Sequence, residues 1–456
     1  MPRESLEISL AGIQLSKESV TPLYIQLYQQ IRQSILNGQL RRGDRIPASR
    51  NLAKKLEVSR VIVNQAYEQL ILEGYILGKT GSGTFVSDQV PDHLLLAGAK
   101  SGEKNPNDRS HSEGSIQSNL FAQSNLVPFQ IGTPSLDQFP YKAWQSIGVK
   151  VLKDLKKHHL GYDDGLGHWE LREQIASYLR IARAVRCDTE QVIVLTGAQQ
   201  GLNIITRAIL ERGDKVWMED PGYFGAKNAF EEAGAKICHV PMEKDGLDIR
   251  FGKMKFPDAK MIYVTPSNQF PLGYTLTHAK RLELLSWASE NKVWILEDDY
   301  DSEFRYEGNP LPSLQGLDKS ERVIYIGTFS KVLFPGLRLA YIVVPNVSLV
   351  PLFKEIKLTT DRQSPILEQL ILTRFMQDGG FLRHIRKMRL LYAERQKILR
   401  QLIEEYLSGY LSIEYLPSGM HLLCWLSERI DVTIFRDEAR KQKLSIFFIQ
   451  TSTKRN

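Results

Sequence analysis

The sequence predicts an α/β protein with two structural parts: a small N-terminal winged helix-turn-helix and a large domain built on a mostly parallel sheet. Residues 22–86 show helical periodicity followed by a glycine-rich hairpin pattern, whereas the later part alternates short apolar runs with helical segments. The 456-residue chain is also too long for one ordinary core. We therefore expect domains at 1–87 and 129–456, joined by a polar, flexible linker over 88–128.

The composition excludes several classes of protein. With 42% hydrophobic and 24% charged residues the chain is globular, and no apolar run approaches the roughly 18 residues that span a bilayer. The acidic N-terminus lacks the apolar core of a secretory signal. The widely spaced cysteines Cys187, Cys238 and Cys424 argue against a disulfide framework or a zinc site. We expect a cytoplasmic protein without a metal site.

Positive charge is concentrated near the N-terminus. The net charge is +7, and from Arg32 to Arg60 eight basic residues stand against two acidic ones, a local balance of +6. A DNA phosphate backbone attracts such a cluster. The cluster taken alone fits a solvated basic surface better.

The N-terminal part predicts a series of helices and a hairpin. Apolar residues at helical spacing predict a first helix over 22–37, ending at Gly38. Shorter helices follow to Lys55 and over 60–73, with Ser49 and Ser59 as their expected caps.

The helix over 60–73 is predicted to have one buried face. The residues expected to be buried are Val63, Ala66, Tyr67 and Leu70. The residues left outside, where a groove-reading helix needs polar side chains, are Arg60, Asn64, Gln65 and Glu68. Residues 76–86 then predict a hairpin with Gly81 and Gly83 at its turn. This order of elements is typical of a winged helix.

Residues 20–87 resemble the GntR family of bacterial transcription regulators. The matching stretches are GDRIPASRNLAKKL, VSRVIVNQAYEQLILEGY and GSGTFV. The resemblance implies that the partner is double-stranded DNA. It also implies which residues face the DNA: Arg50, Ser59, Arg60, Asn64 and Gln65, with Lys79, Gly81 and Gly83 of the wing near a phosphate or the minor groove. The alternative for each is an ordinary exposed or capping residue.

The large domain is predicted from apolar runs of strand length. The runs are QVIVL, KVWM, MIYV, VWIL and VIYI, and each is followed by a loop and helical sequence. Such runs suit strands buried on both faces of a parallel sheet. Ligand groups are then expected at the carboxyl ends of the strands.

Lys331 and Asp298 suggest a pyridoxal phosphate site at those strand ends. Lys331 lies in GTFSKVLFPGLRL, 33 residues after Asp298 in VWILEDDYDSEF. The amine can form a Schiff base with the cofactor's aldehyde, and the buried carboxylate can keep the ring nitrogen protonated. A lone lysine would be read as a surface residue, so the prediction depends on further groups in the same segments.

Further segments supply the other groups that this cofactor needs. In LTGAQQGL, Gly197 leads into a helix start at Ala198 or Gln199, whose free amides suit a phosphate. Tyr223 in EDPGYFGA is expected to lie on the ring, although an aromatic residue there is more often part of a core. The remaining expected contacts are Tyr300 with the ring oxygen, Ser330 with the phosphate, and Arg338 with the phosphate or a substrate.

Together these segments resemble the fold type I aminotransferases over about residues 129–450. The winged helix fused to such a domain resembles the MocR subfamily of GntR regulators, whose named members respond to vitamin B6 or to amino compounds. The resemblance implies a head-to-tail homodimer that binds pyridoxal 5'-phosphate. It also implies the cofactor roles given above for Lys331, Asp298, Tyr223, Tyr300 and Arg338.

The chain departs from the aminotransferase pattern at two places. Where the family has an Asn-Pro-Thr-Gly turn, residues 268–273 read NQFPLG, and Asn268 is expected to take the asparagine's place at the ring oxygen. The arginine that grips a substrate carboxylate has no match, because the sequence ends at IFFIQTSTKRN. We therefore expect an incomplete C-terminal subdomain.

These observations favour a regulator that senses pyridoxal phosphate, or an amine or amino acid, through the Lys331 aldimine. Its target genes would belong to vitamin B6 or amine metabolism. One alternative is a pyridoxal phosphate-dependent aminotransferase with an accessory DNA-binding domain; the domain could also retain a transamination half-reaction without turnover. Another is a truncated regulator that binds DNA without responding to an effector.

Overall fold

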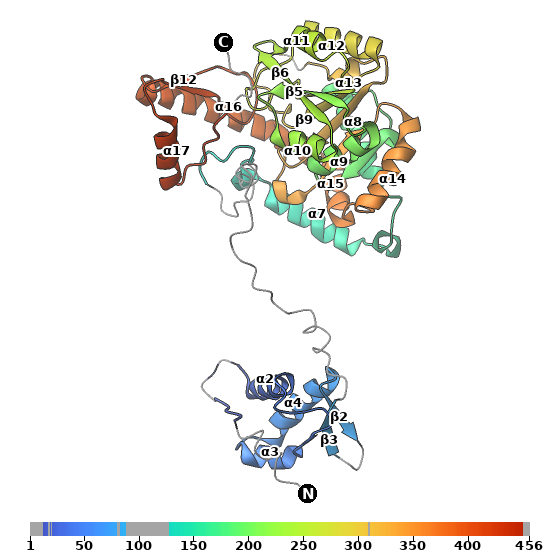
Figure 1. The fold of residues 1–456 in the computed structure, drawn as a ribbon, viewed down its shortest axis with the longest axis vertical. Helices are drawn as coiled ribbons and strands as arrows, with labels where there is room; N and C mark the ends of the chain where they lie inside the picture. The colour runs from blue at the N-terminus through green and yellow to red at the C-terminus, as the bar shows by residue number, and fades with distance from the viewer. Residues whose placement is uncertain are drawn as a thin grey trace. The chain divides into compact units, whose positions relative to one another are not determined.

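The computed structural model describes residues 12–16, 19, 21–79, 83–87, 127–308 and 311–449. The chain divides into two compact units, Met1–Gly114 and Ser115–Asn456 (Figure 1). The division falls within the segment expected to be a linker. Each unit is described by itself.

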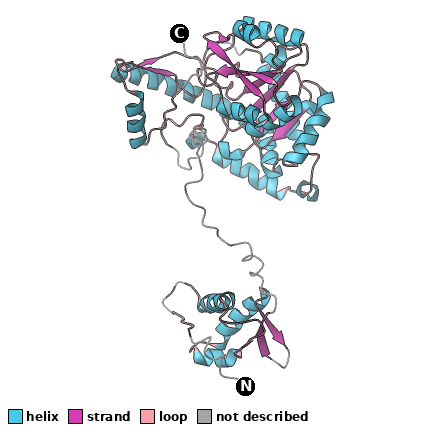
Figure 2. Ribbon diagram, viewed as in Figure 1, coloured by secondary structure: helices cyan, strands magenta, loops and turns pink. Residues whose placement is uncertain are grey.

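The N-terminal unit packs helices against a small antiparallel sheet (Figure 2). Its elements in chain order are α2 (Leu23–Leu36), β1 (Arg45–Ile46), α3 (Ser49–Lys55), α4 (Arg60–Leu72), β2 (Ile76–Lys79) and β3 (Gly83–Val86). Among the described residues the strand order is β1-β3-β2, with antiparallel pairing throughout. Leu27, Ile31 and Leu70 form part of the core between α2 and α4. The predicted winged helix is confirmed.

Ser59 occupies the predicted cap position of α4, whereas Ser49 does not cap α3. Helix α3 begins at Ser49 itself, with Ala48 in the cap position, and the Ser59 side chain accepts no capping hydrogen bond at the start of α4. The physical reason at Ser49 is competition for its hydroxyl. Nε of Arg60 donates to Ser49 Oγ across 3.2 Å, so this oxygen joins the two helices instead of closing one of them.

The large unit is built on a mixed, mostly parallel sheet. In the described residues the strand order is β4-β11-β10-β9-β8-β5-β6-β7. The strands are β4 (Val192–Leu195), β5 (Lys215–Asp220), β6 (Lys236–Glu243), β7 (Gly246–Leu247), β8 (Met261–Val264), β9 (Trp294–Asp299), β10 (Val323–Thr328) and β11 (Ala340–Val343). Strands β6, β5, β8, β9 and β10 pair in parallel, whereas β11 is antiparallel to both its neighbours and β7 to β6. The predicted α/β class and the five predicted strands are confirmed.

Both faces of this sheet are covered because alternate side chains of each strand point to opposite faces. Ile324 and Ile326 of β10 pack in one core with α9 (Ala198–Ile209), α10 (Phe224–Glu232) and α14 (Val350–Thr360). The strand residues that alternate with these belong to two cores on the opposite face of the sheet. The helices of those cores are α7 (Tyr141–Lys153), α8 (Trp169–Arg183), α15 (Ile366–Gln377) and α16 (Gly380–Leu407) in one, and α11 (Ile249–Lys255), α12 (His278–Asn291) and α13 (Leu314–Leu317) in the other.

The C-terminal region extends from this body. Figure 1 shows α16 leading away from the sheet to a pair of antiparallel strands and a last helix. These elements are β12 (Leu411–Ile413), β13 (Cys424–Leu426) and α17 (Val432–Lys441). Within the part of the chain that the structure describes, no helix is both long and apolar enough to cross a membrane.

Candidate functional site

Helix α4 presents the polar surface expected of a DNA-reading helix. Val63, Ala66, Tyr67 and Leu70 are all buried, as predicted from their spacing. Arg60 and Gln65 are exposed, and Asn64 is partly exposed. Arg50 of α3 and Ser59 before α4 are also exposed. The helical period therefore separates the packing residues from those available to a ligand.

The small sheet places an additional arginine, Arg45, beside the wing. Lys79 pairs with Gly83 across β2 and β3, while Gly81 and the Lys79 side chain lie outside the described residues. Gly83 has a φ of +112°, and a Cβ added there would lie 2.8 Å from Arg45 Nε. Arg45 was counted in the basic cluster but not predicted as a site residue. Strand pairing of β1 with β3 brings it to the wing.

Lys331 and Asp298 are brought together by neighbouring parallel strands. Asp298 lies in β9 opposite Ile326 of β10, and the chain reaches Lys331 just after β10 ends. Burial raises the pKa of Asp298 to about 6, while the Tyr263 hydrogen bond and the Lys331 charge lower it. Burial lowers the pKa of Lys331, and the charges of Asp301 and Asp298 oppose this effect. A lysine of lowered pKa supplies a neutral amine, the form that acts as a nucleophile.

Tyr263 is a residue of this site that sequence reasoning missed. It lies fully buried in β8, and its hydroxyl donates to Asp298 Oδ2 across 2.7 Å. This hydrogen bond stabilises the carboxylate form of a residue that burial would otherwise neutralise. The available signal was a tyrosine in MIYV, an otherwise apolar run, since a buried hydroxyl requires a partner.

The other acidic residues of β9 have separate partners, which explains how the strand tolerates them. Glu297 accepts hydrogen bonds from the backbone N–H groups of Leu314 and Gln315, each at 2.9 Å. Asp299 pairs with Nε of Arg183 at 2.8 Å. Buried charge is costly unless it is paired in this way. Successive side chains of β9 alternate between the faces of the sheet, so Asp298 faces a different environment from its neighbours.

Gly197, the start of α9 and Arg338 form a cradle suited to an anion. Helix α9 begins at Ala198, as predicted, with Gly197 in the cap position. A Cβ added to Gly197 would lie 2.8 Å from Arg338 Nη2, so the guanidinium lies directly against this glycine. The first N–H groups of a helix lack acceptors within the helix. Together with an exposed arginine they favour negative charge.

Two residues predicted to contact the cofactor, Tyr223 and Gln199, contact α10. Tyr223 precedes α10, and a Cβ on Gly225 would lie 2.5 Å from its ring. The charges of Asp298 and Arg338 both influence the pKa of Tyr223, which burial raises to about 12. Gln199 Nε2 donates to the Gly225 carbonyl across 2.9 Å, so its side chain connects α9 to α10.

Asn268 and Tyr300 also lie together despite the altered turn sequence. Asn268 Nδ2 donates to Tyr300 Oη across 3.2 Å. Ser330 lies beside Lys331, and its backbone N–H donates to Thr328 Oγ1 across 3.2 Å. Lys331 Nζ itself donates to the carbonyl of Gly132 across 2.9 Å. The segment near residue 132, far away in sequence, therefore reaches the lysine.

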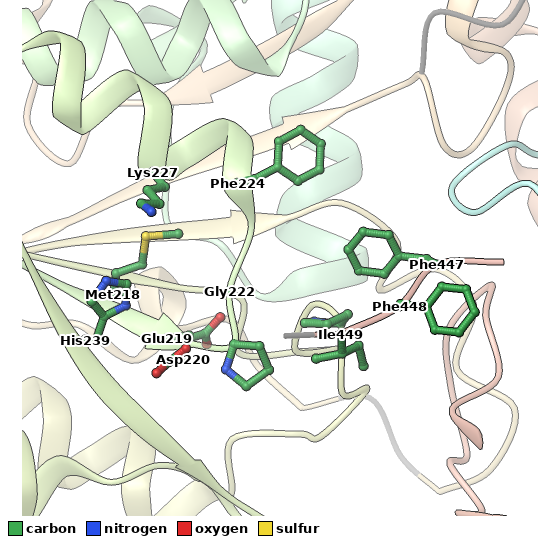
Figure 3. Close-up of a pocket in the computed structure, with 12 residues that line it drawn as sticks. Met218, Glu219, Asp220, Gly222, Phe224, Lys227, His239, Phe447, Phe448 and Ile449 are labelled. Carbon is green, nitrogen blue, oxygen red and sulfur yellow. The ribbon is translucent and has the colours of Figure 1, made fainter. Parts of the chain in front are cut away.

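A small pocket of about 120 Å³ lies at the end of β5. Its lining includes Glu219 of β5 and Gly222 of the loop that carries Tyr223. Figure 3 shows Phe447, Phe448 and Ile449 of the C-terminal segment on the other side of this pocket. The pocket is separate from the groups around Lys331. Among the described residues, no group of three or more histidine, cysteine or acidic side chains is arranged to hold a metal ion.

Comparisons with known proteins account for both units. The family Aminotransferase class I and II matches residues 125–443, and the family Bacterial regulatory proteins, gntR family, matches residues 23–86. A kynurenine aminotransferase of Pyrococcus horikoshii, solved in complex with PMP, has a TM-score of 0.67 and 26% sequence identity, over 76% of this chain and 88% of that one. This likeness concerns the fold of the large unit.

Two relatives match over nearly the whole chain. "Probable rhizopine catabolism regulatory protein MocR" of Rhizobium meliloti is 38% identical over 432 residues, covering 94% of this chain and 86% of the relative. "HTH-type pyridoxine biosynthesis transcriptional regulator PdxR" of Corynebacterium glutamicum is 31% identical over 424 residues, covering 92% and 87%. The chain therefore belongs to the GntR family of transcriptional regulators, in the MocR group that joins a helix-turn-helix domain to an aminotransferase class I and II domain.

Proposed function

We propose that this protein is a transcriptional regulator that binds pyridoxal 5'-phosphate at Lys331 and thereby senses the cofactor or an amino compound. The observation that carries the proposal is the presence, in one chain, of an exposed polar helix α4 and the Lys331–Asp298 cluster. The winged helix binds an operator, and ligand binding at Lys331 changes its affinity for that operator. Such a response requires the ligand to favour one of two states of the protein.

The chemistry of the large unit's residues fits this cofactor. When bound, pyridoxal phosphate supplies an aldehyde and an electron-poor ring. Lys331 would supply the amine that holds the aldehyde, and Asp298 would hold a proton on the ring nitrogen. Gly197, the start of α9 and Arg338 bind the phosphate. A side chain at Gly197 would fill the cradle, because a Cβ added there would lie only 2.8 Å from Arg338 Nη2.

Tyr223 and Tyr300 complete the set of residues proposed to hold the cofactor. Tyr223 packs against the ring, and Tyr300 with Asn268 contacts the ring oxygen. Ser330, Ala198 and Gln199 lie near the phosphate. Partly buried tyrosines and an amide supply hydrogen bonds and shape without adding charge, so they orient the cofactor rather than attract it.

The effector and the assembly are also proposals. Relatives named for pyridoxine biosynthesis and rhizopine catabolism support target genes in vitamin B6 or amine metabolism, and an amine as effector. We propose a head-to-tail homodimer, supported by exposed aromatic and aliphatic side chains near the start of α8. Leu160, Tyr162 and Trp169 are 73%, 80% and 48% exposed.

A gel shift on the chain's own upstream region tests the central proposal. Purified protein is titrated with and without pyridoxal phosphate and with a panel of primary amines, and light scattering of the same preparation measures its mass. We expect retention of the upstream DNA, a change in affinity with the ligand, and no change for Lys331→Ala. Lys331→Arg is a matched control that retains the positive charge but cannot capture an aldehyde.

The alternatives predict different results in the same experiment. Failure to retain the DNA under any condition would refute the proposal that the protein is a transcriptional regulator. Sustained exchange of amino groups between an amino acid and a keto acid would instead favour an aminotransferase with an accessory DNA-binding domain. DNA binding that is the same for the original chain and Lys331→Ala, with every ligand, would favour a regulator that does not respond.

A further inference from the structure

Three arginines line a small pocket that the proposed function does not use. Arg183 ends α8, Arg281 belongs to α12, and Arg305 lies on the loop after β9. In the described part of the chain, the rest of the lining consists of serine and threonine side chains and one leucine, with no acidic residue. Like charges repel one another strongly away from water, so three guanidinium groups around one pocket require a negative partner.

The carboxylates near this pocket do not balance its positive charge. Asp299 pairs with Nε of Arg183 at 2.8 Å, and the charge of Glu297 acts on Arg281. Arg305 has no comparable partner: its Nε is buried without a hydrogen-bond partner among the described residues, and it forms no ion pair with any of them. Two carboxylates therefore stand against three guanidinium groups, and one positive charge is left over.

Ser418 adds a buried hydroxyl without a partner to the same lining. Ser418 is 4% exposed, and its Oγ has no hydrogen-bond partner among the described residues. It forms an isolated antiparallel bridge with Arg305, beside a hydrogen bond of 2.9 Å from the Gly419 N–H to the Phe304 carbonyl. Side chains opposed in such a pair lie on one face, so the hydroxyl and the guanidinium are neighbours. Buried polar groups are normally hydrogen-bonded, and here both lack a partner.

Arg281 is held at the pocket by neutral acceptors. It is 0% exposed, and its guanidinium donates to the backbone carbonyls of Leu276, Pro266 and Pro312. A guanidinium carries five N–H groups, so two of those of Arg281 have no acceptor among the described residues. Burial lowers the pKa of Arg281 to about 10, and the charges of Arg183 and Arg305 act in the same direction. Arg281 is therefore still a cation at neutral pH, with free donors.

The size of the pocket limits the ligand to a single atom. Its volume is about 10 Å³, which is room for one particle of the size of water. A carboxylate or phosphate group has at least three heavy atoms and needs more space. A water molecule would satisfy the donors but leave the extra positive charge unbalanced, and buried charge is costly unless it is paired. A halide ion accepts hydrogen bonds from guanidinium and hydroxyl groups and also supplies the missing negative charge.

We propose that this pocket binds one chloride ion, held by the three guanidinium groups and the Ser418 hydroxyl. The ion joins α8 and α12 to the loop after β9 and to the segment before β13. Ser267, which also lines the pocket, directly precedes Asn268, so the ion supports the loop that carries a proposed cofactor contact. Chloride binding itself requires neither the cofactor nor DNA.

Thermal unfolding of the full chain in two sodium salts tests this inference. Sodium chloride replaces sodium gluconate at constant ionic strength, so only the anion changes, and gluconate is too large for the pocket. We expect the unfolding midpoint of the large unit to rise by about 3 °C when chloride reaches roughly 100 times its Kd. Arg305→Gln and Ser418→Ala should lose most of this rise. Arg250→Gln is the matched control: it removes an exposed arginine of α11 and should keep the rise.

The width of the chlorine NMR resonance measures binding of the ion directly. We expect the original protein and Arg250→Gln to broaden the resonance, bromide to reverse the broadening, and Arg305→Gln to cause much less of it. Equal midpoints in chloride and gluconate would show that the pocket holds water, and would overturn the inference. A chloride effect of the same size in Arg305→Gln and Ser418→Ala would also overturn it, since the ion would then bind elsewhere. If Arg305→Gln does not fold, the result for Ser418→Ala decides.

Discussion

Helix α4 and the Lys331 cluster differ in how their functional groups are supported. On α4 the candidate DNA contacts come from one continuous segment, and they are exposed while the residues between them are buried. Around Lys331 the groups follow several different strands, and burial shifts the pKa values of Asp298, Tyr223 and Lys331 itself. A surface read by a helix depends on local periodicity. A chemical site depends on long-range packing that places charges in a low-dielectric environment.

The largest effect expected from this comparison concerns the support of α4. Leu70 is fully buried, whereas Leu72, two residues later, is 84% exposed. We expect Leu70→Ala to lower the free energy of unfolding of the N-terminal unit by about 2–5 kcal/mol and to abolish DNA binding. Calorimetry and a gel shift measure these effects.

Leu72→Ala is the control for that variant, with an expected change within about 0.5 kcal/mol. Cofactor absorbance should be the same in both variants, since the large unit has its own cores. Equal losses in the two variants would contradict the assignment of the buried face.

In the large unit, a substitution at Asp298 should increase stability while it weakens cofactor binding. Leu70→Ala, by contrast, should reduce both stability and DNA binding. A carboxyl whose pKa is raised by folding contributes stability at low pH, and this is lost as the pH rises through about 6. At neutral pH the ionised Asp298 therefore destabilises the protein. Asp298→Asn should raise the free energy of unfolding there by up to about 3 kcal/mol, since two pKa units correspond to that much.

The same variant should bind pyridoxal phosphate more weakly, because the amide cannot hold a proton on the ring nitrogen. Urea unfolding at pH 5 and pH 7.5 checks the stability change, which should fall to about half at pH 5 and vanish only below the ordinary pKa of 3.8. If Asp298→Asn is less stable than the original protein at pH 7.5, burial of the ionised Asp298 carboxylate does not destabilise the protein.

The smallest expected effect concerns a single contact on α4. Arg60→Ala should weaken operator binding by about 1–3 kcal/mol, and the salt dependence of binding shows whether Arg60 contacts a phosphate or a base. Gel shifts at two salt concentrations measure both quantities, with Leu72→Ala again as control. Cofactor binding should not change. If Arg60→Ala binds the operator with unaltered affinity, Arg60 does not contribute to recognition, and other residues such as Arg45 must contact the DNA.

The candidate cofactor site could be proposed from sequence where a short segment carried its own chemical signal. Gly197 before a helix start, and Lys331 and Asp298 after apolar runs, could each be found from spacing. The partners of Tyr263 and Arg45 could not be predicted, because each contacts a neighbour that lies far away in sequence. Tyr263 reaches Asp298 across adjacent strands, and Arg45 reaches Gly83 across the wing.

The sequence by itself determined the two-part organisation, the buried face of α4 and the strands of the large sheet, because helical and extended periodicity are local properties. Tertiary structure alone decided the partner of each acidic residue in β9. Glu297 meets backbone amides, Asp298 meets Tyr263, and Asp299 meets Arg183. The three side chains are adjacent in sequence, but the pleat of the strand and the order of the sheet send them into different surroundings. Burial raises the pKa of Glu297 and of Asp298 to about 6, whereas the charge of Arg183 holds the pKa of Asp299 below its usual value.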